Sequence, residues 1–83
     1  MTTKYKTEFQ QYNTSQNITA NCNVITFINN GGSVIYVNNY PLAASGGSLQ
    51  VAGNAGEVDV TMYKVNCGTN AGDFWVIKKV DQS

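Results

Sequence analysis

The acidic residues Glu57 and Asp59 are spaced so that two carboxylates could work together. Residues two apart in a strand share one face, with α-carbons about 6 to 7 Å apart. Glycosidases use two carboxyl groups, but they place them on opposite sides of a sugar. Two acids on one face of one strand cannot enclose a substrate, so we predict a solvated strand face at a turn and no catalytic site.

A larger set of oxygen-bearing side chains could bind calcium if two predicted turns met in the fold. These residues are Asn54, Glu57, Asp59, Asn70 and Asp73. Their spacing is not that of an EF-hand loop. Asn and Asp also form turns for reasons of their own, since they tolerate positive φ and bond their own backbone. We therefore predict turns here, with no metal and no other cofactor.

Cys22 and Cys67 are the two cysteines, and neither has a partner at metal-ligand spacing. A disulfide between them would stabilise so small a chain by about 4 kcal/mol in the loop-entropy model. The N-terminus shows no secretory signal, and a chain made without one normally stays in a reducing compartment. The residues leave two readings open, which are buried free thiols or a disulfide formed after release from the cell.

The composition excludes several classes of chemistry. The 83 residues include no His and no Arg, and five Lys balance five acids. Without His there is no Ser–His, Cys–His or His-based zinc site. Without Arg or a basic stripe, nucleic-acid binding is not expected. No apolar run is long enough for a membrane-spanning helix, so no membrane partner is expected either.

The elements that position these residues are predicted to be strands, because β-branched and aromatic residues dominate every apolar stretch. We predict an all-β fold, a single-domain sandwich or barrel of six to seven short, mostly antiparallel strands over residues 1–83. The expected strands are 5–12, 24–28, 34–37, 48–51, 57–65 and 74–80, with a further short strand within 13–21. Residues 1–21 form an N-terminal strand or an arm that leaves the body.

Several local features of this arrangement are specific. Asn30-Gly31 predicts a hairpin between 24–28 and 34–37, because tight hairpin turns demand positive φ. Strand 5–12 is expected to be half-buried. Strand 57–65 is expected to contain a bulge or one helical turn at residues 60–62, where the alternation of apolar residues shifts by one position. Residues 68–73 read as a hairpin loop. Lys78 and Lys79 are expected to protect an exposed sheet edge.

Exposed aromatic residues are the candidate interaction sites. Phe74 and Trp75 are neighbours on the last strand, so we expect one to be core and the other a contact surface. Strands 24–28, 34–37 and 74–77 are apolar on both faces, which is typical of strands in the middle of a sandwich or of strands lying under a partner. The interaction candidates are Tyr5, Phe9, Tyr36, Tyr40 and Trp75.

Three segments, VNNYPL (37–42), GSLQV (47–51) and GNAGEVDVTMY (53–63), carry a family resemblance. In turn spacing and composition they resemble small tailed-bacteriophage virion proteins, such as capsid auxiliary, decoration or fibre-associated proteins of Bacteroidetes phages, including crAss-like phages. The resemblance covers about the middle third of the chain. It implies a β-sandwich or barrel that binds a capsid or tail protein, without catalytic or cofactor residues.

The functional expectation is therefore a non-enzymatic structural component of a phage virion, made in the host cytoplasm. Its expected partners are itself, as a homo-oligomer, and a capsid or tail protein. Two alternatives remain open. One is a small carbohydrate-binding module in which Trp75 or Tyr40 stacks on a sugar ring. The other is a cytoplasmic host-takeover or inhibitor protein.

Overall fold

The computed structural model describes residues 4–54, 56–68 and 72–82, and these form an all-β fold. The sequence prediction of an all-β chain is thus confirmed, although the described residues form eight strands and not six or seven. The strands are β1 (Lys4–Tyr12), β2 (Gln16–Thr19), β3 (Val24–Asn29), β4 (Ile35–Val37), β5 (Tyr40–Leu42), β6 (Gly47–Ala52), β7 (Met62–Asn66) and β8 (Phe74–Gln82). No helix capable of crossing a membrane is found in these residues.

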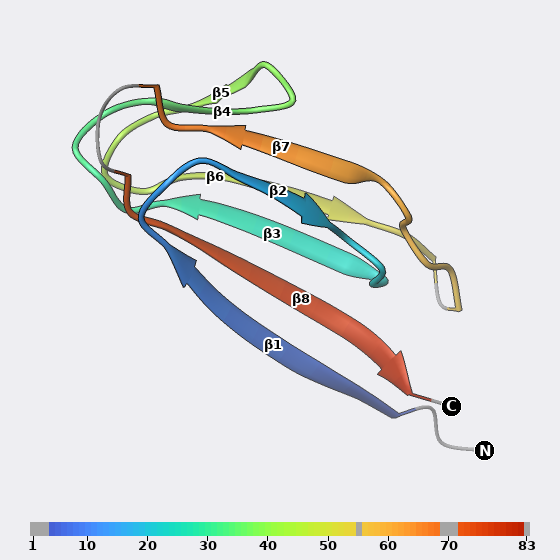
Figure 1. Ribbon diagram of the computed structural model, residues 1–83. Helices are drawn as coiled ribbons and strands as arrows, with labels where there is room; N and C mark the ends of the chain where they lie inside the picture. Colours follow the sequence, from blue (N-terminus) through green and yellow to red (C-terminus); the bar gives the residue numbers. More distant parts are fainter. Residues whose placement is uncertain (1–3, 55, 69–71, 83) are drawn as a thin grey trace.

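The strands form two antiparallel four-stranded sheets with a nested pairing. Sheet A has the order β1-β8-β3-β6, and sheet B has the order β2-β7-β4-β5 (Figure 1). The pairs β1·β8, β2·β7, β3·β6 and β4·β5 are those of one long hairpin folded at the β4–β5 turn. Pairing of β3 with β8 and of β4 with β7 then rolls this hairpin into two layers. This strand order is that of a jelly roll.

The core lies between the two sheets and follows from the alternation of side chains along each strand. In β3, Ile25 and Phe27 point inward, while in β7 Tyr63 and Val65 do so. The Phe27 and Tyr63 rings meet across the layers at 5.2 Å between centroids. Because alternate residues of a strand face opposite sides, this inward set leaves a second set of side chains on the outer face of each sheet.

Two buried asparagines at the ends of β3 hold the neighbouring loops. The Asn23 side-chain amide donates to the Asn54 and Glu57 carbonyls at 2.7 and 2.9 Å. The Asn29 amide donates to the Ser33 and Leu42 carbonyls at 2.9 and 3.1 Å. Buried backbone carbonyls need such partners, and these two side chains therefore fix the connections that cross between the sheets.

The hairpin predicted between 24–28 and 34–37 is wrong. β3 lies in sheet A and β4 in sheet B, so the connecting residues cross from one layer to the other. Neither Asn30 nor Gly31 has the positive φ that a tight hairpin turn requires. The turn is made instead by Asn38 and Asn39, with φ of 47° and 69°, which join β4 to β5.

Other local predictions also need correction. Residues 57–61 belong to a loop with one isolated bridge, Cys22 to Asp59, so the expected strand 57–65 begins only at Met62 and needs no bulge. Lys78 and Lys79 lie on β8, an inner strand between β1 and β3, and do not guard an edge. β7 and β8 lie in different sheets, so 68–73 is not a hairpin loop; residues 69–71 are outside the described part.

β1 and β8 form a ribbon that projects beyond the rest of the molecule (Figure 1). Along β1, every residue but Tyr12 is exposed, so the expectation of a half-buried first strand is wrong. The chain measures 47 × 18 × 16 Å and has a radius of gyration of 13.2 Å. A compact domain of this length would have a radius of gyration of about 12 Å. The N-terminal strand thus pairs inside its own fold and also extends away from the core.

Candidate interaction surface

The outer face of sheet A carries an apolar patch that spans three strands. Since Phe74 and Val76 are buried, Trp75 and Ile77 face outward, and Phe9 lies directly opposite Ile77. Ile28 of β3 lies opposite Trp75. We call these four residues, Phe9, Ile28, Trp75 and Ile77, the outer patch. Phe9 is 63% exposed and Trp75 is 39% exposed, so much of the apolar surface of the outer patch contacts solvent.

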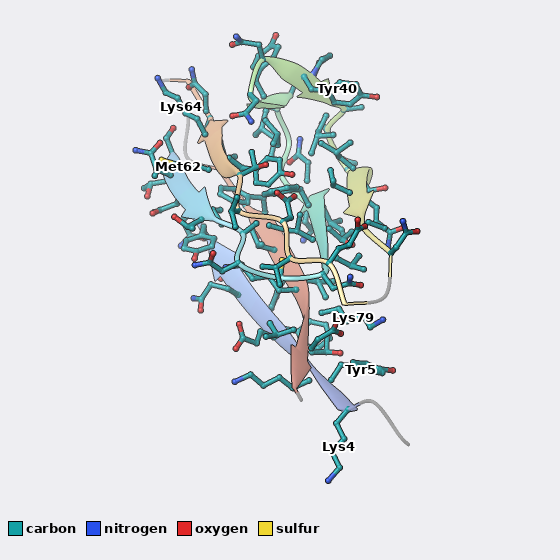
Figure 2. The ribbon with its side chains drawn as sticks, turned by 90° about the vertical axis from the view of Figure 1, so that its right-hand side faces the viewer. Lys4, Tyr5, Tyr40, Met62, Lys64 and Lys79 are labelled. Atoms are coloured by element: carbon teal, nitrogen blue, oxygen red, sulfur yellow. The ribbon has the colours of Figure 1, made fainter. Side chains whose placement is uncertain are left out.

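The surroundings of the outer patch are polar but carry little charge. Its neighbours on the same face include Gln11, Thr26 and Gln50, and the Gln50 amide donates to the Thr26 hydroxyl at 3.4 Å. Charge appears further along the ribbon, where the Lys79 ammonium lies 4.9 Å from the centre of the Tyr5 ring (Figure 2). An apolar centre that contains aromatic residues and has a polar rim is the composition of protein-binding surfaces.

Beside the outer patch, β1 leaves a backbone edge unpaired. β1 pairs with β8 over all nine of its residues, and no other described strand pairs with its second edge. We call this the open edge of β1. The ladder continues without a bulge, and β1 contains no Pro. Such an edge presents a row of N–H and C=O groups to any strand that approaches.

The five predicted interaction residues are all exposed, but they do not form one surface. Tyr5, Phe9 and Trp75 share the outer face of sheet A, whereas Tyr36 lies on the outer face of sheet B. Tyr40 follows the β4–β5 turn at the end of the molecule opposite Tyr5 (Figure 2). Ile28 and Ile77 were not predicted from the sequence to be surface residues. Each is next to a buried residue of its strand, Phe27 or Val76, so alternation places each on the outer face of the sheet.

The acidic pair Glu57 and Asp59 is occupied in holding its loop. Glu57 Oε1 accepts a hydrogen bond from the Asn54 N–H, and Asp59 accepts bonds from the Thr61 N–H and the Tyr63 hydroxyl. Hydrogen bonds from Thr61, and then from Tyr63, lower the pKa of Asp59. Burial, and then the bond to Asp59, raise the pKa of Tyr63 to about 12. The predicted strand face is wrong here, because these acids cap a loop.

The turns considered for calcium do not meet. Asp73 directly precedes β8, where Gln11 and Asn30 donate to its carboxylate at 2.7 and 3.2 Å. Asp59 bridges Cys22 near the other end of β8, where Asn23 bonds the Lys79 carbonyl. Asn70 lies outside the described residues. Among the residues that the structure describes, no three His, Cys, Asp or Glu side chains gather in a metal-binding group.

Both cysteines are buried and carry free thiols. Cys22 lies by the Asp59 bridge, while Cys67 lies by Ser15, whose hydroxyl accepts from the Cys67 N–H at 2.9 Å. Burial raises the pKa of the Cys22 thiol. Of the two alternatives left open by the residues, the structure therefore has the buried free thiols.

A hollow of about 590 Å³ on the outer side of β2 and β7 offers little chemistry. Its lining residues are Ser15, Gln16, Asn17, Lys64, Val65 and Asn66. Lys64 is the one titratable side chain in this lining, so the hollow does not bring an acid and a base together. We therefore take the outer patch and the open edge of β1 as the candidate recognition surface. Comparisons with protein-family models, with curated proteins and with solved structures find no match to this chain.

Proposed function

We propose that this chain is a non-enzymatic structural component of a phage virion, a capsid auxiliary or decoration protein. It acts by assembling with itself and by binding a capsid or tail protein. The observation that carries the proposal is the outer patch on sheet A, where Phe9 and Trp75 remain exposed next to the open edge of β1. Burial of apolar side chains such as these drives most protein association.

The architecture is compatible with this proposal. Jelly rolls include viral capsid domains and lectins, although a fold by itself does not determine a function. A chain of 83 residues also has a small core, and burial of apolar area in an assembly would add to its stability. The resemblance of segments 37–42, 47–51 and 53–63 to small phage virion proteins agrees with the same role.

The test is incorporation into particles. Particles produced from the genome that encodes the chain are purified and analysed by quantitative mass spectrometry, with wild-type protein or a Phe9→Gln variant. We expect wild-type protein in the particles and a severalfold smaller amount of the variant. Phe9 is 63% exposed, so its replacement should remove binding surface without unfolding the protein.

Met62→Gln provides the matched control, because Met62 is 60% exposed but lies on sheet B (Figure 2). This variant should enter particles at the wild-type level. Absence of the wild-type protein from particles, together with capture of a host enzyme by the purified protein, would contradict the virion role and favour a host-takeover role.

The exposed Trp75 also favours a second candidate, a carbohydrate-binding module in which the indole stacks on a sugar ring. Trp75 is the sole tryptophan, so emission excited at wavelengths that only tryptophan absorbs reports on this site. Titration with a panel of oligosaccharides tests this candidate. A saturable change in emission, lost in Phe9→Gln, would support sugar binding, and an unchanged emission across the panel would exclude it for those sugars.

A further inference from the structure

The open edge of β1 has features that select a specific partner. Its strand has nine residues, longer than the usual five or six, and carries none of the bulges or prolines that commonly block such edges. The half formed by residues 4–9 is exposed on both faces, so neither sheet B nor a loop of the described chain covers it. A second strand can therefore approach this half without meeting the body of the protein.

The side chains of β1 alternate in a way that makes the strand complementary to itself. Lys4, Lys6 and Glu8 lie on the face that continues the inner side of sheet A, and Tyr5, Thr7 and Phe9 lie on the outer face. In an antiparallel pair, directly opposite residues share a face and interact most strongly. If two copies of β1 pair about Thr7, Lys6 lies opposite the second copy's Glu8, and Tyr5 lies opposite its Phe9.

Other registers weaken this complementarity. Pairing about Lys6 also brings Lys4 opposite Glu8, but it places Lys6 opposite itself and separates Tyr5 from Phe9. Pairing about Glu8 places Glu8 opposite itself. Pairing about Phe9 leaves Lys6 and Glu8 without oppositely charged partners. A shift by one residue would put the charged face of one strand on the aromatic face of the other. Among these registers, the one centred on Thr7 combines opposite-charge pairs with Tyr5 opposite Phe9 and places no like charges opposite each other.

We propose that β1 pairs antiparallel with β1 of a second copy of this chain, centred on Thr7, so that two molecules share one continuous eight-stranded sheet. This pairing rests on the proposed function, because it names the self-assembly contact of the same surface. The contact is twofold and uses the same surface in both copies, so it closes at a dimer. Each Tyr5 then extends the outer patch of the other copy, and both patches face the same side.

Charge reversal tests the pairing in purified full-length protein by sedimentation over a concentration series. We expect a reversible wild-type dimer whose dissociation constant rises at least about tenfold in Lys6→Glu and in Glu8→Lys, because two attractive pairs become two repulsive ones. The double exchange, Lys6→Glu with Glu8→Lys, should recover wild-type affinity. Lys6 and Glu8 also form an exposed 3.2 Å ion pair within one chain, which contributes little to folding.

Lys64→Glu is the matched control, since it changes the net charge equally on sheet B, and it should dimerise like the wild type. A monomeric wild type, or single and double variants that dimerise equally well, would overturn the proposal. Circular dichroism melting curves confirm that each variant is folded.

Cysteine cross-linking tests the register. Opposite residues in an antiparallel pair have α-carbons about 4.5 to 5.5 Å apart, within the range of a disulfide. Under mild oxidation, Thr7→Cys should therefore give a covalent dimer. Gln11→Cys lies on the same face but far from the centre, and it should not. Wild-type protein controls for the buried Cys22 and Cys67, and equal cross-linking of both variants would contradict the register.

The two proposals fail in different ways. A wild-type protein that enters particles but shows no β1-dependent dimer keeps the virion role and removes the pairing. A protein that dimerises as described but is absent from particles keeps the pairing and removes the virion role.

Discussion

At the scale of single residues, polar side chains determine where the loops lie. Asn29 is fully buried, and besides donating to the Ser33 and Leu42 carbonyls it accepts from the Gly31 N–H at 3.0 Å. One side-chain amide thereby pairs backbone groups of a loop and of β5 that would otherwise lack hydrogen-bond partners. Asn is abundant throughout the chain, but its role at this position differs from that of the turn-forming asparagines.

We predict that Asn29→Ala lowers the free energy of unfolding by about 3 kcal/mol, because it removes the donor to the buried Leu42 carbonyl and to the partly buried Ser33 carbonyl. Urea unfolding followed by fluorescence measures the change. Asn30→Ala is the control: Asn30 is exposed and forms a solvent-exposed hydrogen bond with the Asp73 carboxylate, so its loss should cost less than about 1 kcal/mol. Equal losses in the two variants would contradict this role of Asn29.

Tyr63 makes the free energy of unfolding depend on pH in the alkaline range. The pKa of its hydroxyl is raised from 10.0 to about 12 in the folded protein. The folded state therefore retains a proton that the unfolded chain releases in this window. We predict that the contribution of Tyr63 is fully present below pH 10 and is lost as the pH rises towards 12.

Urea unfolding over a pH series across that window measures this loss. Tyr63→Phe should remove most of the decline, whereas Tyr5→Phe, which changes an exposed tyrosine, should leave it unchanged. A decline that is as steep in Tyr63→Phe as in the wild type would show that other groups cause it.

At the scale of elements, the crossings between sheets need backbone conformations that few residues allow. Between β5 and β6, the Gly47 N–H donates to the Ala43 carbonyl at 3.1 Å, and Ser45 and Gly46 have positive φ. A Cβ at Gly47 would overlap the Ala43 backbone. This tight connection lets the chain pass from sheet B to sheet A without a long loop.

We predict that Gly47→Ala destabilises the fold by about 2 kcal/mol or more, because backbone atoms must move to accommodate the methyl group. Gly32→Ala is the control, since its Cβ would meet nothing within 4 Å. That change should be neutral or slightly stabilising, as it restricts the unfolded chain. Equilibrium urea unfolding distinguishes the two, and a loss in Gly32→Ala as large as that in Gly47→Ala would be inconsistent with the overlap.

The elements also show what the sequence could and could not predict. β1, β6 and β8 were found because β-branched and aromatic residues mark strands locally. The partner of β3 was not found, because Asn30-Gly31 resembles a hairpin turn while the choice between β4 and β8 as a neighbour depends on the whole fold. The exposure of Phe9 and Trp75 follows from the alternation of side chains along each strand. Their proximity to Ile28 could not be predicted locally, because it depends on the pairing of β1 with β8 and of β8 with β3.

At the scale of the whole molecule, the projecting ribbon of β1 and β8 has fewer stabilising contacts than the two-layer body. Residues 4–6 pair only with residues 80–82 of β8. The pairing of β3 with β8 ends where Val24 lies opposite Lys79, so residues 80–82 have no partner in β3. A two-stranded segment without a covering layer is only marginally stable in water. Cooperative opening should therefore begin at this end.

We predict that in dilute solution the amides of Lys4–Lys6 exchange with solvent orders of magnitude faster than those of Ile25 and Phe27, because local opening there costs less free energy. Hydrogen exchange followed by NMR measures both groups. At concentrations where the β1–β1 dimer forms, protection at Tyr5–Phe9 should rise. Protection at Lys4–Lys6 equal to that of the core in a monomer would contradict the gradient.

The nested pairing also determines the order in which the chain can fold. β4 and β5 meet across two residues, but β1 meets β8 only after more than sixty residues of intervening chain. Contacts so distant in sequence slow folding, and all-β domains of this kind fold in about milliseconds to seconds. During synthesis on the ribosome, β1 emerges before the other described strands, and it cannot pair with β8 until β8, the last of them in sequence, has been synthesised. The strand that we propose as the site of self-pairing is therefore also the one whose edges stay unpaired longest in a nascent chain.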